Sequence, residues 1–188
     1  MSDANDWREI SRDLRADSPF LRVYCERIAT PTRPNGVDWM VVRRKQATVV
    51  APRTPEGNFL LVRQERIPVR RLMWEFPAGQ IDGEVNESTI LETAHRELGE
   101  ETGCRAAGEM IPLGFYFSSA GFTDEQCHLF LATDVVPRDE GHAHDEWESI
   151  VECRAFSPDE LRRMIATGEI YDANTLSLFA RLVATGYL

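Results

Sequence analysis

The alternation of apolar and polar positions is clearest near the middle of the chain, where it predicts an amphipathic helix. Apolar residues recur there every four positions and form the narrow stripe of a helix packed on a core: Ile90, Ala94 and Leu98. Thr89 is followed three residues later by Glu92, the spacing of a capping box, so we expect Thr89 to be the N-cap. Gly103 suits the left-handed conformation that closes many helices, and we place the end of this helix there.

Runs rich in β-branched and aromatic residues predict strands on both sides of this helix. Residues 20–31 and 37–45 are two such runs. Asn35-Gly36 lies between them and accepts the positive φ of a tight turn, so we expect a β-hairpin that turns there. The other predicted strands are residues 47–52, 58–69, 74–79, two strands within 110–136, and 150–156.

The two ends of the chain add further predictions. Three apolar residues before position 18 have helical spacing and predict a short helix or a loose arm: Trp7, Ile10 and Leu14. Ser157 and Pro158 have the residue types of an N-cap and a first helical position, and Gly168 ends that helix. A last helix begins within 172–174, with a predicted core stripe of Leu176, Phe179, Leu182 and Val183. Strands with helices on both sides favour an α/β fold, an α/β/α sandwich with a mixed sheet, preceded by the N-terminal hairpin.

Composition and charge exclude several classes of protein. The chain has 188 residues, 43% of them hydrophobic and 28% charged, as expected for one folded domain with a small extension. A net charge of −10 argues against a nucleic-acid partner, because binding to the phosphate backbone needs a basic surface. It does not exclude a nucleotide substrate, because bound Mg²⁺ can invert the local field.

Cysteine spacing and hydropathy predict a protein of the cytoplasm. The four cysteines have no metal-binding spacing and are expected to stay reduced. The N-terminus lacks the apolar segment of a signal peptide, and no apolar run reaches the roughly 18 residues of a membrane-spanning helix. We therefore expect no membrane association.

Three carboxylates lie on one side of the predicted central helix. Glu97, Glu100 and Glu101 have the spacing i, i+3, i+4, and Arg96 lies beside them. Like charges at this spacing repel by roughly 0.2–0.5 kcal/mol per pair. One interpretation is a solvated acidic face. The other is a site for hard divalent cations, which bind carboxylate oxygens, and the preceding glycine-containing loop favours it.

These residues resemble the signature of the Nudix hydrolases. Its second half is present as Arg96-Glu97-Leu98-Gly99-Glu100-Glu101-Thr102-Gly103-Cys104, and its first glycine as Gly79. Relative to the family pattern, three extra residues precede Arg96, and Ser88 stands where a glutamate is expected. We place this insertion in the loop before the helix, where Glu84 or Glu87 could replace the missing glutamate. The resemblance implies a Nudix-type sandwich over residues 45–188 and an N-terminal arm and hairpin over residues 1–44.

The resemblance also implies roles for residues of the signature. It places two or three Mg²⁺ ions, with Mn²⁺ as an alternative, on the Ala78 carbonyl, Glu97, Glu101 and also Glu100, which is a second candidate for the catalytic base. Arg96 would hold these carboxylates in position.

Outside the signature, several residues resemble the ADP-ribose pyrophosphatase branch of the family. Arg66 stands where an arginine contacts substrate, and the alternative is an ordinary surface arginine at a strand end. Glu125 ends a stretch resembling the branch's S-P-G-x-T/S-x-E loop, whose glutamate contacts substrate, although Ala120 replaces the proline. Gly79 is also assigned to substrate binding. Residues 145–150 resemble an E-x-E-x-I segment, which makes Glu146 the candidate base and Glu148 a metal ligand, unless this is a solvated acidic loop.

The resemblance implies hydrolysis of a nucleoside diphosphate linked to another moiety. ADP-ribose, giving AMP and ribose 5-phosphate, is the favoured substrate. The alternatives are another sugar nucleotide such as GDP-mannose, or a Nudix-like sensor that binds such a ligand without catalysis. In the same branch, an N-terminal sheet exchanges between subunits, so we expect a homodimer; the alternative is an extra hairpin on a monomer.

Overall fold

The computed structural model describes residues 7–138 and 149–188, and these form two compact units. The N-terminal unit contains the residues up to Lys45 together with Phe117–Glu125. The core unit contains Gln46–Tyr116 and Gln126–Leu188. Within the described residues, none of the helices has the length and apolar character needed to cross a bilayer.

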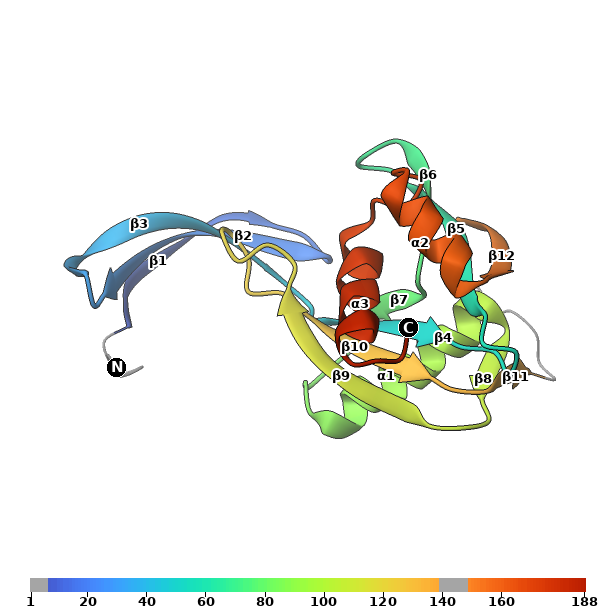
Figure 1. Cartoon of the computed structure of the whole chain (residues 1–188). Helices are drawn as coiled ribbons and strands as arrows, with labels where there is room; N and C mark the ends of the chain where they lie inside the picture. Colours follow the sequence, from blue (N-terminus) through green and yellow to red (C-terminus); the bar gives the residue numbers. More distant parts are fainter. Residues whose placement is uncertain (1–6, 139–148) are drawn as a thin grey trace. The chain divides into compact units, whose positions relative to one another are not determined.

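The N-terminal unit is an antiparallel sheet of three strands in the order β1-β2-β3. The strands are β1 (Arg8–Asp17), β2 (Leu21–Thr30) and β3 (Arg33–Arg44), drawn in blue in Figure 1. The prediction of a helix or loose arm before residue 18 was wrong. Ile10 and Leu14 are four residues apart, a spacing that fits a strand as well as a helix, and pairing with β2 decides between them.

The predicted hairpin is present, but its turn was placed wrongly. Thr30 pairs with Arg33, so the chain turns at residues 31–32 rather than at Asn35-Gly36. Gly36 has the expected positive φ of 83°, but it lies inside β3, where the register with β2 shifts between Ile28 and Thr30. The positive φ therefore serves a strand irregularity instead of the turn.

A mixed sheet lies at the centre of the core unit. Its strands, in spatial order, are β7 (Ala78–Gln80), β4 (Ala47–Pro52), β10 (Gln126–Ala132) and β9 (Met110–Phe117). Strand β4 runs parallel to β10 and antiparallel to β7. A second sheet has the order β12 (Ile150–Phe156), β5 (Phe59–Arg66) and β6 (Arg71–Glu75), and β8 (Cys104–Ala106) pairs with β11 (Val135–Pro137).

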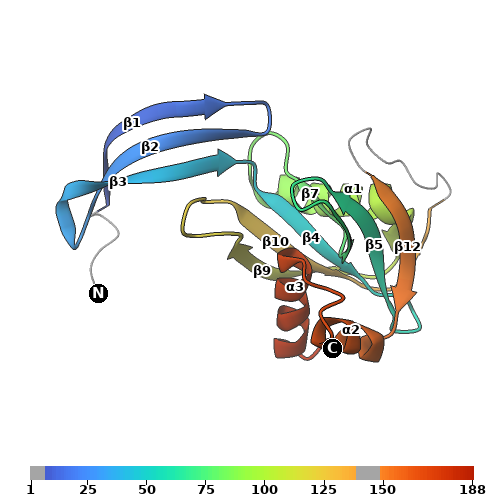
Figure 2. The same ribbon diagram turned by 90° about the horizontal axis from the view of Figure 1, so that it is seen from above.

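Helices cover both faces of the central sheet. Figure 2 shows α1 (Glu87–Thr102) on one side of the strands, and α2 (Pro158–Ala166) and α3 (Ala173–Ala184) on the other. Successive residues of β4 point to opposite faces: Val49 packs in the cluster that contains Leu178 of α3, and Val50 in the cluster that contains Leu98 of α1. The predicted α/β/α sandwich is therefore confirmed.

Two details of the helices differ from the predictions. The N-cap of α1 is Asn86, whose side chain accepts from the Thr89 N–H, and Thr89 is the third helical residue of that capping box. The first helical turn therefore includes residues that we expected in the loop. In α3 the predicted core residue Leu182 and the unpredicted Leu178 are both fully buried, whereas Val183 is 47% exposed. The predicted cap at Ser157 and the left-handed Gly103 are confirmed, and the last helix begins within 172–174 as predicted, with Asp172 as its N-cap.

Candidate active site

Helix α1 carries two acidic side chains into the interior. Glu97 is 2% exposed and Glu101 is 1% exposed, whereas Glu100 lies nearer the surface. Their spacing of four residues places Glu97 and Glu101 on one side of the helix. A solvated acidic face is thus excluded for these two residues. Buried carboxylates are costly unless hydrogen bonds, cations or metal ions compensate their charge.

The backbone of β7 lies directly against these carboxylates. The Ala78 N–H donates a hydrogen bond to Glu101 Oε2 at 3.1 Å. A Cβ atom placed on Gly79 would lie only 1.7 Å from Glu97 Oε1, so the absence of a side chain at residue 79 makes room for that carboxylate. The structure therefore brings together four of the residues predicted for the site.

Arg96 connects the carboxylates on the outer side of α1. Its Nη2 donates to Glu97 Oε1 at 2.5 Å, and its Nη1 donates to Glu100 Oε2 at 2.5 Å. Nη2 also reaches the Gln80 carbonyl of β7 at 3.3 Å. These charge-assisted hydrogen bonds fix the directions of both carboxylates, and a part for Arg96 in catalysis stays a prediction.

The donor set fits a hard divalent cation. Carboxylate oxygens and backbone carbonyl oxygens are the ligands that Mg²⁺ and Mn²⁺ bind, and both kinds lie at this site. Over residues 7–138 and 149–188, no group of three or more His, Cys, Asp or Glu side chains is arranged to hold a metal by itself. Any ion bound here therefore needs further ligands from backbone, water, substrate or residues beyond these ranges. Metal binding by Glu100 and by the Ala78 carbonyl stays a prediction.

An ion pair between β5 and β6 joins the predicted substrate residue Arg66, which is half-buried, to the buried Glu75. Its Nε donates to both Glu75 oxygens at 3.0 Å, and its Nη2 donates to Oε2 at 2.5 Å. Burial raises the pKa of Glu75, and the charge of Arg66 opposes that shift. Arg66 also interacts electrostatically with Glu101, so the arginine lies within reach of the acidic site.

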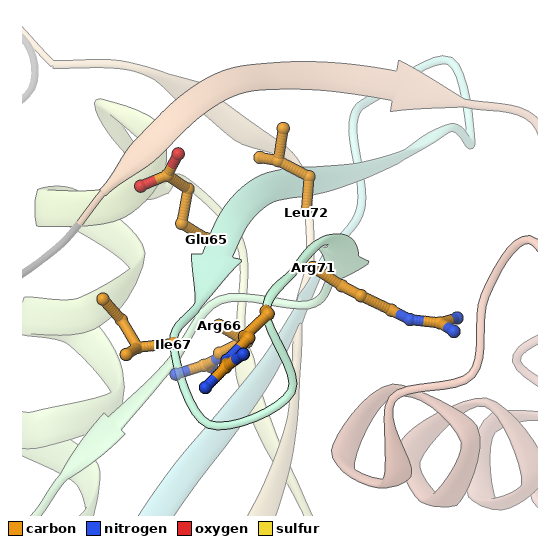
Figure 3. Close-up of a pocket in the computed structure, with 6 residues that line it drawn as sticks. Glu65, Arg66, Ile67, Arg71 and Leu72 are labelled. Atoms are coloured by element: carbon orange, nitrogen blue, oxygen red, sulfur yellow. The ribbon is translucent and has the colours of Figure 1, made fainter.

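Arg66 lines an open pocket at the end of the β5–β6 hairpin, shown in Figure 3. Arg70, Arg71 and one carboxylate, Glu65, line the same pocket, so its arginines outnumber its acids. The sequence patterns did not single out Glu75. The available signal was a glutamate directly after the apolar run 72–74, because a buried carboxylate needs a partner.

Glu125 lies in the other unit. It ends the connecting loop, residues 118–125 between β9 and β10, which belongs to the N-terminal unit. Its Oε1 pairs with Arg44 Nε at 3.0 Å, and its Oε2 accepts from the Ser118 hydroxyl at 2.6 Å. Contact between Glu125 and a substrate stays a prediction.

The candidate base Glu146 and the candidate metal ligand Glu148 lie outside the described residues. Their roles stay predictions.

Comparisons with known proteins agree with this geometry. The model of the NUDIX domain matches residues 42–179. The ADP-ribose pyrophosphatase of Bacillus subtilis (strain 168) is 35% identical over 136 residues, which cover 72% of this chain and 70% of that protein. The ADP-ribose pyrophosphatase of Mycobacterium tuberculosis (strain ATCC 25618 / H37Rv) is 32% identical over 151 residues, 78% of this chain and 70% of that protein.

Two further proteins are similar to this chain. The methanol dehydrogenase activator of Bacillus methanolicus is 33% identical over 137 residues, 72% of this chain and 71% of that protein. The crystal structure of an ADP compounds hydrolase matches with a TM-score of 0.77 over all of both chains, at 18% identity, which supports the fold. The domain match and the relatives together show that this chain is a member of the Nudix hydrolase family, in the branch of the ADP-ribose pyrophosphatases.

Proposed function

We propose that the protein hydrolyses the diphosphate bond of a nucleoside diphosphate derivative in a Mg²⁺-dependent reaction, with ADP-ribose as the favoured substrate. The observation that carries the proposal is the burial of Glu97 and Glu101 against the Ala78–Gly79 backbone. A protein that only bound an anionic ligand would gain nothing from two buried carboxylates at its site, because they would repel the ligand.

The chain's own residues would divide the work of catalysis. Glu97 and Glu101, with Glu100 and the Ala78 carbonyl, would hold the cations, and Mn²⁺ could replace Mg²⁺. When bound, such ions neutralise the diphosphate and lower the pKa of the attacking water. Arg96 keeps Glu97 and Glu100 in position through the hydrogen bonds described above. Arg66, fixed by Glu75, would donate a hydrogen bond to a phosphate oxygen, and Glu146 would accept the proton of the water.

The choice of ADP-ribose is supported by the two ADP-ribose pyrophosphatases among the relatives. Hydrolysis of ADP-ribose would give AMP and ribose 5-phosphate. Ala120, where the branch has a proline, leaves GDP-mannose and other sugar nucleotides as the second candidate substrates.

A panel of nucleoside diphosphate derivatives, incubated with Mg²⁺ and analysed for released nucleotides, tests this function. We expect the highest kcat/KM for ADP-ribose, loss of turnover in EDTA, and recovery with Mg²⁺ or Mn²⁺. Bound divalent ion should also raise the melting temperature, because the carboxylates converge only in the folded protein. Turnover that continues unchanged in EDTA would refute the metal-dependent mechanism, and an inactive protein on the whole panel would refute the function.

We also propose that the protein is a homodimer in which the N-terminal sheet packs on a second copy. All the residues of β1 are exposed, including the large apolar side chains Ile10 and Leu14. Trp39 and Met40 of β3 are half exposed as well. A sheet that leaves several large apolar side chains in water is typical of an interface.

A further inference from the structure

The connecting loop lies along strand β3 in parallel register. The Trp39 indole N–H donates to the Gly121 carbonyl at 2.6 Å. Further along the strand, the Val42 N–H donates to the Phe122 carbonyl at 2.7 Å, and Val42 forms a parallel β-bridge with Thr123. Backbone pairing thus attaches the loop to the N-terminal sheet.

Ion pairs continue this register at the end of β3. Arg43 pairs with Asp124, and Arg44 Nε lies 3.0 Å from Glu125 Oε1. Arg43 is itself held by the buried Glu26, with Nη2 2.9 Å from its Oε2. Two consecutive arginines of one strand therefore neutralise two consecutive carboxylates of the loop, and their guanidinium groups fix its end.

The Glu125 carboxylate uses both of its oxygens inside the protein. Oε1 faces Arg44, Oε2 accepts from the Ser118 hydroxyl at 2.6 Å, and the whole residue is only 5% exposed. The Ser118 N–H also donates to the Glu125 carbonyl at 3.1 Å, which closes the loop on itself. Each oxygen keeps an unused lone-pair site, but the buried carboxylate offers little accessible surface to a ligand hydroxyl.

We infer that Glu125 is a positioning residue, which with Arg44 holds the connecting loop on strand β3, and that it does not contact the substrate. Resemblance alone suggested the opposite role. The inference rests on the proposed function only for its kinetic test, because the contacts that carry it lie within the N-terminal unit. Replacing Arg44 leaves the buried Glu125 carboxylate without its cation, and replacing Glu125 removes the charge that holds the exposed Arg44 to the loop, so the loop should separate from β3.

Hydrogen exchange measures this separation without substrate or metal. The reporters are the Val42 N–H, which is bonded to the loop, and the Ser118 N–H, which closes it. In Glu125→Gln and in Arg44→Gln we expect exchange at both amides to rise by about tenfold or more, as for a locally opened segment. The double variant should exchange no faster than the more affected single variant, because both changes break the same ion pair.

Two control variants keep this test specific. Arg27→Gln removes the same charge from the same sheet and breaks the exposed Arg27–Asp38 pair, so its exchange at the two reporter amides should match the wild type. Trp39→Phe removes only the indole hydrogen bond to the loop and should give a smaller increase than Glu125→Gln. This second variant still tests loop attachment if an ion-pair variant fails to fold.

Kinetics separate positioning from substrate contact. On the best substrate of the panel, the two single variants should raise KM by a similar factor, about tenfold, and the double variant by no more than either. A rise in KM for Glu125→Gln alone, with wild-type exchange at Val42 and Ser118, would overturn the inference in favour of a substrate contact. Wild-type exchange in both single variants would overturn it as well. If no substrate is found, the exchange measurement still tests the role of Glu125 in holding the loop. A failure of the proposed function is therefore distinguishable from a failure of this inference.

Discussion

Replacing Gly79 by alanine tests the arrangement of the acidic site most directly. The new Cβ would lie 1.7 Å from Glu97 Oε1 and 2.0 Å from its carboxyl carbon, whereas contacts of Cβ atoms under 3.0 Å essentially do not occur. The carboxylate must therefore move by more than about 1 Å, which far exceeds the roughly 0.2 Å tolerance of metal–ligand distances. No strain in φ contributes, because Gly79 does not have a positive φ.

The expected effect has two parts. Overpacking around a buried carboxylate should cost about 1–3 kcal/mol of stability, and each kcal/mol lowers the melting temperature of a chain of this size by roughly 2–4 °C. Misplacement of Glu97 should weaken Mg²⁺ binding by about 10–100-fold and lower kcat by about 10²-fold. Calorimetric titration with Mg²⁺, thermal unfolding and kcat at saturating Mg²⁺ measure these quantities.

Two variants control this experiment. Gly121→Ala introduces the same methyl group where nothing lies within 4 Å, so melting temperature and Mg²⁺ affinity should not change. Glu97→Gln keeps the size of the side chain and should reproduce the loss of Mg²⁺ affinity without the overpacking. Wild-type Mg²⁺ affinity and kcat in a folded Gly79→Ala protein would show that the position of Glu97 does not matter for the reaction.

The remaining predictions concern the base, the assembly and the response to pH. Glu101→Gln should lower Mg²⁺ affinity and kcat together, whereas Glu146→Gln should keep Mg²⁺ affinity and lower kcat by roughly 10²–10⁴-fold; wild-type kcat in Glu146→Gln would transfer the role of base to Glu148 or Glu100. Light scattering at micromolar concentration should give the mass of a dimer, and a monomer would contradict the packing proposed for the N-terminal sheet. Burial lowers the pKa of His128 from its ordinary value of 6.5. Just below pH 6.5, His128 therefore binds a proton more readily in the unfolded chain than in the folded protein. Stability should therefore fall as the pH drops from 7 through 6, and His128→Gln should lose less melting temperature over this range; equal losses would contradict the assignment.

Part of the site was already evident in the sequence because it depends on one helix. The run from Arg96 to Gly103 specifies a helix of known periodicity, so the relative directions of Glu97, Glu100 and Glu101 follow from their spacing alone. The Arg96 hydrogen bonds to Glu97 and Glu100 span one and four residues, and they were predictable for the same reason. The Ser157 cap was predictable too, because its partner Glu160 lies within the same helical turn.

Errors occurred where two local signals competed or where a partner lay far away in the chain. Thr89 and Asn86 are both suitable caps, and only the observed backbone shows that the helix begins after Asn86. Asn35-Gly36 is a good turn, yet the pairing of Thr30 with Arg33 places the turn elsewhere. At Asn35-Gly36 a local turn propensity was outweighed by strand pairing, whereas at Asn86 one local cap replaced another, with Thr89 as its capping-box partner.

The sequence by itself determined the family, the layered fold and the helix that presents the carboxylates, because each depends on periodicity and on residues close together in the chain. Only the tertiary structure decided which arginine neutralises which buried carboxylate. Glu75 pairs with Arg66 of the neighbouring strand, and Glu125 pairs with Arg44, which lies 81 positions earlier in the chain. No local pattern encodes such pairs, because the free energy of a buried charge depends on whatever partners the fold brings to it. The roles of Arg66 and Glu125 therefore depend on contacts that only the folded chain makes.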